Sequence, residues 1–434
     1  MDIDFWKVLP TSTGGTTTTP TGTLPPVTGT VTGTAGSVVR RFTSEAVTDV
    51  HDVTLMLMEP NADYEWVASA RNDPSITIGG SWTTGILPTG AQSYGVISGT
   101  SSQEFVLSQS RCSTDAYVVV VNTTSGLVNY YQDLKFGALD PFLDGLQWTD
   151  EQTFLALVGQ DVVETDLWDN QLLLLESGID YTERVHHDVF RKDGLTLVTF
   201  SEPVPLGAPS YLTPTMDGFF MFDGNVRVGE WHLQDHHLPA SEGGDYSHAN
   251  SVWMDDNFNV LMSFRHLSSV ISVFADPMDP LFGEVNWQLS GNPDDQALPT
   301  DFLLTTSSGT EAAFRQQHNA HLLPNGRLAM FDNELGLTLS KVLQISLDTN
   351  NWTADVEAYY ELPQHCDFQG GAWHTASGNP IATCAPQATG YEFDAGSPLH
   401  RWSMQLFCAS GTATYLPRMI PWEPPDFLLR QNQP

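Results

Sequence analysis

Three short stretches of the sequence carry histidines in similar settings: His186-His187, His248 with Asn250, and His318. A neutral imidazole, with an ordinary pKa of about 6.5, is a nitrogen nucleophile near neutral pH. A second imidazole can give a proton to a leaving group and take one from an acceptor. This combination is typical of group transfer through a histidine, so we take His318, His187 and His186 as candidate catalytic residues.

An arginine and an amide accompany these histidines. Arg265 follows Leu261–Phe264 in the stretch that begins at His248. A guanidinium offers a planar fork to two oxygens of an anion, and the Asn250 amide can donate a further hydrogen bond. A transferring group that spreads negative charge over three oxygens needs such fixed donors. We therefore take Asn250 and Arg265 as candidate substrate-binding residues.

Each of these residues also has a structural interpretation. His318 and His248 can be packed histidines, Arg265 can form an ion pair between neighbouring sheets, and Asn250 can cap a turn. We interpret the Asp332-Asn333 pair as structural. The same holds for four further histidines, which we assign to the surface or to packing: His236, His237, His321 and His374.

The histidines recur because the chain repeats a unit. Five stretches consist of an apolar run, a turn and a second apolar run, and they begin at Asp144, His187, His248, His318 and Gln369. Each predicts a hairpin, and a second strand pair follows it. Together with the strands of 117–134, this gives six units of four strands over residues 112–422. The pattern predicts an all-β chain with a six-bladed β-propeller, in which the first strand of each blade faces a shared channel.

The N-terminal part differs in composition. Residues 11–36 contain almost only Thr, Gly and Pro, which predicts an extended tether. Beyond it, the alternating runs up to residue 87 predict a small β-sandwich, and Met58–Tyr64 resembles the tyrosine corner of fibronectin type III domains. An ordinary strand, turn and strand remains the alternative. The predicted segments are a tether (1–36), a sandwich (37–90), a linker (91–111), the propeller (112–422) and a C-terminal tail (423–434).

Residues 185–333 resemble the aryl-sulfate sulfotransferase family. The resemblance rests on three stretches: His186-His187-Asp188, His248–Val252 with Arg265, and Gln317–Ala320 leading to Phe331-Asp332-Asn333. It implies a small β-sandwich before a six-bladed propeller. It also implies transfer of a sulfuryl group from an aryl sulfate to a phenol, through a sulfated histidine and without a nucleotide sulfate donor.

The resemblance also implies roles for individual residues. His318 matches the nucleophile, and His248, Asn250 and Arg265 match the groups that hold the sulfate oxygens. The pair His186-His187 matches a further channel histidine. Alignment of the repeats places His186 in the column of His318 and His187 in the column of Asn250; we favour His187 and retain both.

Composition limits the partners. The 434 residues include 17 Lys and Arg against 52 Asp and Glu, a net charge of −35, and no basic patch interrupts this excess, so we expect no nucleic-acid partner. No run approaches the roughly 18 apolar residues of a membrane-spanning helix. The first residues show no export signal. The tether and a predicted disulfide, most simply Cys366 with Cys384, favour an extracellular or periplasmic protein, with a surface tether as an option.

Metals and other functions remain open at this stage. We predict no cofactor and no metal, although Asp276–Asp279 or Asp294-Asp295 can bind calcium weakly and the channel histidines can form a transition-metal site. Two other functions compete with the transferase. One is a polysaccharide lyase or hydrolase that uses the channel histidines, and the other is a non-catalytic extracellular binding or adhesion propeller.

Overall fold

A computed structural model gives the fold. It describes residues 2–7, 39–43, 56–88, 91, 94–112, 115–134, 143–205, 213–239, 244–291, 298–334, 338–407, 414–416 and 418–425. Regular structure in these ranges is β-strand, apart from the short 3-10 helix η3 (Leu233–Asp235). No helix in the described part of the chain has the length and apolarity to cross a membrane. The all-β prediction is therefore confirmed.

The first residues of the chain belong to a four-stranded N-terminal sheet. Its strands, in spatial order, are β2 (Val39–Thr43), β1 (Asp2–Lys7), β3 (Asp63–Ala70) and β4 (Asp73–Thr83). The prediction that residues 1–36 are tether is wrong for β1. Ile3 and Phe5 of β1 are buried, as period-two alternation requires, and Phe5 packs against Tyr64 with ring centroids 6.5 Å apart. Residues 11–36 lie outside the described residues.

Tyr64 pins the turn before β3. Its hydroxyl accepts a hydrogen bond of 2.8 Å from the backbone N–H of Glu59, and its ring is buried. This contact matches the expected role of a corner tyrosine. The described residues of this module form one sheet, and 44–55 lie outside them, so the fibronectin-like sandwich stays a prediction.

Six further sheets occur in the described residues; three have their four strands in sequence order, and the other three add strands from elsewhere in the chain. The first contains β6 (Phe105–Cys112), β7 (Asp115–Asn122) and β8 (Val128–Asp133), with β30 (Thr414–Tyr415) and β31 (Met419–Trp422) on β6. The second contains β9 (Leu143–Trp148), β10 (Phe154–Val158), β11 (Asp161–Thr165) and β12 (Gln171–Leu175). The third contains β13 (Arg184–Lys192), β14 (Leu195–Pro203), β15 (Thr215–Asp223) and β16 (Val226–His232).

The remaining three sheets hold the rest of the candidate residues. The fourth contains β17 (Ala249–Met254), β18 (Asn259–Phe264), β19 (Ser269–Phe274) and β20 (Val285–Ser290). The fifth contains β22 (His318–Leu322), β23 (Leu328–Asp332), β24 (Lys341–Asp348) and β25 (Thr353–Glu361), with β21 (Leu303–Thr306) parallel to β25. The sixth contains β26 (Gly371–His374), β27 (Pro380–Cys384), β28 (Thr389–Phe393), β29 (His400–Leu406) and β5 (Tyr94–Gly99).

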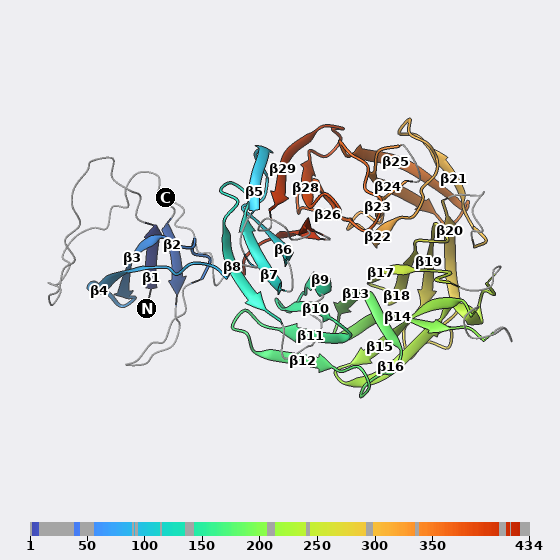
Figure 1. The fold of residues 1–434 in the computed structure, drawn as a ribbon, viewed down its shortest axis with the longest axis horizontal. Coiled ribbons are helices and arrows are strands. Elements are labelled where there is room, and N and C mark those ends of the chain that lie inside the picture. The colour runs from blue at the N-terminus through green and yellow to red at the C-terminus, as the bar shows by residue number, and fades with distance from the viewer. Residues whose placement is uncertain are drawn as a thin grey trace.

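These sheets follow one another around a ring, with β9, β13, β17, β22 and β26 nearest the axis (Figure 1). Strands from both ends of the chain close it. β5 pairs with β29 of the sixth sheet, and β31 pairs with β6 of the first. The predicted linker 91–111 is therefore wrong, because β5 and most of β6 lie within it and belong to the ring. The closing pairs join residues about 300 positions apart, which local sequence patterns do not reveal.

The core lies between neighbouring sheets. Six large clusters of buried apolar residues each combine two adjacent sheets of the ring, as Phe219 of β15 does with Met262 of β18. A central strand packed on both faces is apolar throughout, and Val118–Val121 of β7 are all fully buried. Radial packing of this kind is that of a β-propeller.

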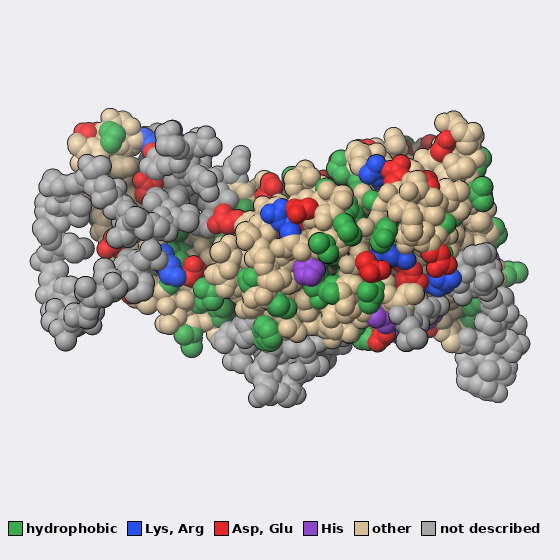
Figure 2. Space-filling model, turned by 90° about the horizontal axis from the view of Figure 1, so that it is seen from above, with side chains coloured by type: hydrophobic (Ala, Val, Ile, Leu, Met, Phe, Trp, Pro, Cys, Tyr) green, Lys and Arg blue, Asp and Glu red, His purple; other side chains and the backbone are tan. Residues whose placement is uncertain are grey.

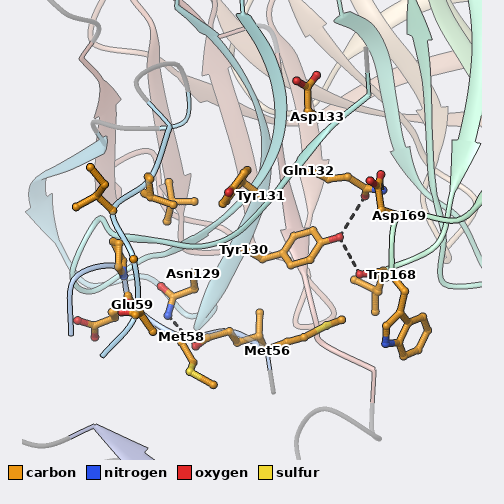
Figure 3. Close-up of a pocket in the computed structure, with 18 of the residues that line it drawn as sticks. Met56, Met58, Glu59, Asn129, Tyr130, Tyr131, Gln132, Asp133, Trp168 and Asp169 are labelled. Carbon is orange, nitrogen blue, oxygen red and sulfur yellow. Dashed lines mark hydrogen bonds between the residues drawn. The ribbon is translucent and has the colours of Figure 1, made fainter. Parts of the chain in front are cut away.

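A cleft of about 750 Å³ separates the segment around Met58 from β8 (Figure 3). Tyr130 crosses it and donates a hydrogen bond of 3.0 Å to the carbonyl of Leu167, while Asn129 Nδ2 donates one of 2.9 Å to the carbonyl of Leu57. These bonds join the first sheet to the second and to the N-terminal segment. None of the described residues that line this cleft is a candidate site residue.

Candidate active site

The innermost strands are irregular where the candidate residues lie. The registers of β13, β17 and β22 shift near His187, Asn250 and Asn319. His187, His248 and Asn319 have φ of 62°, 52° and 54°, in the left-handed region that non-glycine residues rarely adopt. Such bulges redirect side chains, and strained backbone gathers at functional sites. The local distortion therefore changes the direction of the polar side chains at the start of each of these inner strands.

Side chains join each of these inner strands to the inner strand of the next sheet. The N–H of Val252 donates to Asp188 Oδ2 (3.0 Å), that of Ala320 to Ser251 Oγ (3.0 Å), and that of Ala372 to Asn319 Oδ1 (2.9 Å). The bonds run in sequence from β13 to β17, to β22 and to β26. They fix the relative positions of the histidines that precede them, which a site built from several sheets requires.

His318 begins β22 and is almost fully buried, at 4% exposed. Its Nδ1 lies 2.6 Å from Asn333 Oδ1 and 3.1 Å from the carbonyl of Gln316, both acceptors, so Nδ1 carries the hydrogen. Nε2 is buried and has no hydrogen-bond partner among the described residues. Burial lowers the pKa of His318 to about 3, with smaller contributions from Arg265 and His248 and an opposing one from Asn333. The ring is therefore neutral, with a free lone pair on Nε2.

Arg265 lies close to this ring. Its NH2 group donates to Gln316 Oε1 (2.8 Å) and its backbone N–H to the carbonyl of His248 (2.9 Å). The Nε–H is buried and unpartnered within the described residues, where Arg265 also forms no ion pair. The interpretation of Arg265 as an ion pair between sheets therefore finds no support, and the guanidinium has a donor left for a ligand.

Asn250 supports the His318 segment from the neighbouring strand. Its Nδ2 donates to the carbonyl of Gln317 at 2.6 Å, and its buried Oδ1 accepts no hydrogen bond from the described residues. Asn250 was expected to donate to an anion. The structure instead uses one N–H on the backbone beside His318 and leaves the oxygen free, which suits an acceptor for a substrate hydroxyl.

Both histidines of the β13 pair take part, in different places. The ring of His187 lies 4.9 Å from that of His186 and 4.8 Å from that of His248. Burial lowers the pKa of His187 well below its usual value, and the neighbouring His186, His248 and His318 lower it further. His186 points its Nε2 to Asp217 Oδ1 at 3.0 Å. His187 is thus the member that lies among the other site histidines.

His248 lies immediately before β17 and pairs with a carboxylate. Its Nδ1 donates to Asp245 Oδ2, and its ring lies 4.5 Å from that of His266. Burial alone would raise the pKa of Asp245, but the hydrogen bond and charge of His248 outweigh it and lower that pKa. The carboxylate of Asp245 therefore holds the ring of His248 in place through Nδ1.

Asp245, His248 and His266 also form a group whose ligand atoms lie within 4.8 Å of one another. His266 Nε2, however, accepts a hydrogen bond of 2.9 Å from Arg265 NH1. A metal ion would have to share this ring with a guanidinium cation, so the donor set does not fit a metal and we assign none. Of the proposed calcium segments, Asp276 and Asp279 cap backbone N–H groups of their own loop, and Asp294-Asp295 lie outside the described residues.

A cavity of about 190 Å³ lies further along the same inner strands, with aromatic side chains such as Trp148, Trp253 and Trp373 on its walls. Arg418 crosses it. Its NH2 donates to Asp188 Oδ1 (2.5 Å) and its NH1 to the carbonyl of Leu146 (2.9 Å). This buried ion pair joins the end of the chain to the residue next to His187.

Three further residues of the site were missed by sequence reasoning. Asn333 was interpreted as structural, yet it orients His318, and Gln316 and Asp217 were not considered. The stretch Phe331-Asp332-Asn333 was the available signal for Asn333. Asp217 had none, because β15 is the third strand of its sheet and only the fold brings it under His186.

Figure 2 shows Asp and Glu scattered over the visible face, several of them beside Lys or Arg. Surface pairs such as Arg401 with Asp394 neutralise part of the charge, and salt screens the rest within about 10 Å.

Several solved structures resemble the chain at low identity. A protein of unknown function from Bacteroides caccae is 10% identical with a TM-score of 0.46, and the match covers 74% of this chain and 99% of that one. Virginiamycin B lyase from Staphylococcus aureus is 7% identical (TM-score 0.39; 71% and 87%). The Pan2 WD40 domain of Neurospora crassa is 10% identical (TM-score 0.39; 74% and 81%). We infer nothing about function from these likenesses.

No curated protein sequence matches the chain. A family model does: that of arylsulfotransferase (ASST), over residues 98–357. The match extends from the last residues of β5 into β25 and includes every candidate site residue. Since it covers more than half of the 434 residues, the chain belongs to the arylsulfotransferase family.

Proposed function

We propose that the protein transfers a sulfuryl group from an aryl sulfate to a phenolic acceptor through a sulfated His318. Family membership supports an aryl sulfotransferase type of activity. The observation that carries the finer proposal is the state of His318: Nδ1 is held by Asn333, while Nε2 is buried, neutral and without a hydrogen-bond partner in the described part of the chain. Burying a polar atom without a partner is costly, and a lone pair kept in this state is suited to nucleophilic attack.

In the first half-reaction, Nε2 of His318 attacks the sulfur of the aryl sulfate. The S–N bond forms as the S–O bond to the ring oxygen breaks, and the electron pair leaves with the phenolate. The Arg265 Nε–H, which has no partner among the described residues, supplies a donor for the sulfuryl oxygens, on which negative charge is spread, and His248, held by Asp245, lies at the same site. The phenolate of a poor leaving group takes a proton from water as it departs.

In the second half-reaction, the oxygen of a phenol attacks the same sulfur and the S–N bond breaks. The electron pair returns to His318 Nε2, and the phenolic proton passes to a base. His187 is suited to this role because it is neutral and lies among the site histidines. The free Oδ1 of Asn250 can accept the hydroxyl of the incoming phenol while it approaches.

An oxidising compartment fits this proposal. Cys366 and Cys384 form a disulfide, as expected from the sequence, with Cα atoms 5.6 Å apart. Disulfides persist mainly in extracellular or periplasmic surroundings. We propose that the protein works there.

The test is turnover of p-nitrophenyl sulfate with and without a phenol. The proposal predicts p-nitrophenol release that depends on the phenol concentration, with one aryl sulfate of the acceptor formed for each p-nitrophenol. Release that does not respond to the phenol would indicate a hydrolase. No release with any aryl sulfate would favour a binding propeller and would contradict the proposal.

A further inference from the structure

Asp217 lies beneath the histidine pair of β13. It is 2% exposed, it comes from β15 of the same sheet, and its Oδ1 lies 3.0 Å from His186 Nε2. Its Oδ2 accepts hydrogen bonds from the N–H of Ala249 (2.7 Å) and from the hydroxyl of Ser247. Both carboxylate oxygens are thus occupied, and the residue also anchors the start of β17, next to His248.

The hydrogen positions along this chain of contacts follow from chemistry. A carboxylate only accepts, so His186 Nε2 carries a hydrogen and a neutral His186 has its lone pair on Nδ1. That atom lies 2.7 Å from Nδ1 of His187, so His187 Nδ1 must be the donor. His187 is consequently the Nδ1–H tautomer, with its lone pair on Nε2.

We propose that Asp217 and His186 are positioning residues that set the tautomer of His187, so that His187 Nε2 takes the proton of the phenolic acceptor. This inference rests on the function proposed above. As the phenol attacks the sulfated His318, its O–H bond breaks and the proton binds His187 Nε2. The positive charge that His187 gains is shared along the Nδ1–H to His186, and from His186 Nε2–H to the carboxylate of Asp217.

The surroundings of the pair favour this direction of proton transfer. His187 faces His186, His248, His318 and, at longer range, Arg184, all of which are neutral or cationic. Among the described residues, the acidic group within hydrogen-bond distance of the pair is the carboxylate of Asp217, which contacts the ring of His186. Removing its charge therefore removes the group that compensates a proton on His187.

Asp217→Asn tests the inference, because the contacts around the new amide favour one of its two orientations. Ala249 N–H and the Ser247 hydroxyl both require an acceptor, so the amide oxygen takes the place of Oδ2 and the NH₂ group faces His186. His186 Nε2 must then accept, its Nδ1 must donate, and His187 is forced into the Nε2–H tautomer. A base with its proton already on Nε2 cannot accept the phenolic proton.

The rates to measure are those of the two half-reactions. We expect Asp217→Asn to slow transfer from the sulfated enzyme to a phenol about 100-fold, the scale found when partners of a functional histidine are lost. Release of p-nitrophenolate, a good leaving group that needs no proton, should change less than about threefold. Asp223→Asn, an exposed position on the same strand, is the matched control and should change neither rate.

A second pair of variants separates positioning from structure. His186→Gln can donate its Nε2–H to Asp217 and accept from His187 Nδ1–H through Oε1, so it should keep the acceptor step within about tenfold of the unmodified protein. His186→Leu can do neither and should match the loss of Asp217→Asn. Equal slowing of both half-reactions in all of these variants would overturn the inference.

Nitrogen-15 NMR of histidine-labelled protein gives a readout that does not depend on turnover. The inference predicts a hydrogen on Nδ1 of His187 in the unmodified protein and on Nε2 in Asp217→Asn. If both proteins show the Nε2–H tautomer, the inference fails even if the enzyme transfers sulfuryl groups. If the tautomer shifts as predicted but no aryl sulfate reacts, the positioning pair stands and the proposed function fails.

Discussion

Asn333 Oδ1 lies 2.6 Å from His318 Nδ1, and the Asn333 amide nitrogen donates to the carbonyls of Cys366 and Gln369, each at 2.8 Å. The amide group therefore has one orientation, because its nitrogen faces two acceptors and its oxygen faces a donor. The tautomer of His318 is set by this arrangement. The same contact connects the histidine to the segment that carries the disulfide.

Replacement of Asn333 with Ala should release the His318 ring. Without the acceptor on Nδ1, the hydrogen can move to Nε2 and remove the lone pair that attacks sulfur. We expect the rate of p-nitrophenolate release to fall about 100-fold while binding of the aryl sulfate changes little. Asn286→Ala, on β20 of the neighbouring sheet, is the control. A rate within about threefold of the unmodified protein would show that Asn333 does not orient the nucleophile.

Replacement of Arg265 with Lys tests the guanidinium. Lysine keeps the charge but lacks the planar guanidinium, in which NH2 bonds Gln316 while the separate Nε–H stays directed at a ligand. We expect kcat/KM to fall more than about tenfold, or about 1.4 kcal/mol of transition-state stabilisation. Arg327→Lys, in a half-exposed pair with Glu357, should have no effect. A change of less than about twofold at Arg265 would contradict the assignment.

Much of this arrangement follows from the sequence. The five hairpin units, with histidines at three of their starts, predicted the inner strands and the residues near the axis, because that pattern is local. Strand β1 was not predicted, although Ile3 and Phe5 alternate with Asp2 and Asp4. The Thr, Gly and Pro composition of the segment that follows it led us to assign the whole stretch to the tether. Strand β5, Asn333 and Asp217 depend on contacts between distant residues, which no local pattern encodes.

Buried neutral histidines should make stability depend on pH. Burial lowers the pKa of His318 and of His374 to about 3, while an unfolded histidine titrates near 6.5. As the pH falls from about 6.5 towards 3, the unfolded state binds protons that the folded state does not, so the free energy of unfolding decreases.

Denaturant unfolding across this pH range measures the effect. The unmodified protein should lose stability steadily on acidification, and His374→Gln should lose less, because one of the buried histidines is gone. His400→Gln, at the start of β29, is the comparison for a partly exposed ring. Equal pH dependence of all three proteins would contradict burial of His374 as a neutral ring.

The disulfide should support the site as well as the fold. It closes an 18-residue separation, for which loop entropy gives about 3 kcal/mol of stability. Cys366 also supplies a carbonyl to Asn333. We expect a reductant, or the double change Cys366→Ser and Cys384→Ser, to lower the free energy of unfolding by about this amount and to slow sulfation of His318 about tenfold.

The double variant provides the control for this prediction. Its stability and its rate should no longer respond to the reductant. If the reductant lowers stability but leaves the sulfation rate of the unmodified protein unchanged, the disulfide is structural only and its connection through Asn333 to His318 is wrong.

Mass spectrometry of the sulfated intermediate tests the central claim most directly. The protein is treated with p-nitrophenyl sulfate without an acceptor, quenched under alkaline conditions and digested. The account predicts an added mass of about 80 Da on the peptide that contains His318, lost when a phenol is added before quenching and absent in His318→Ala. A stable adduct on another side chain, or turnover by His318→Ala at the normal rate, would contradict it.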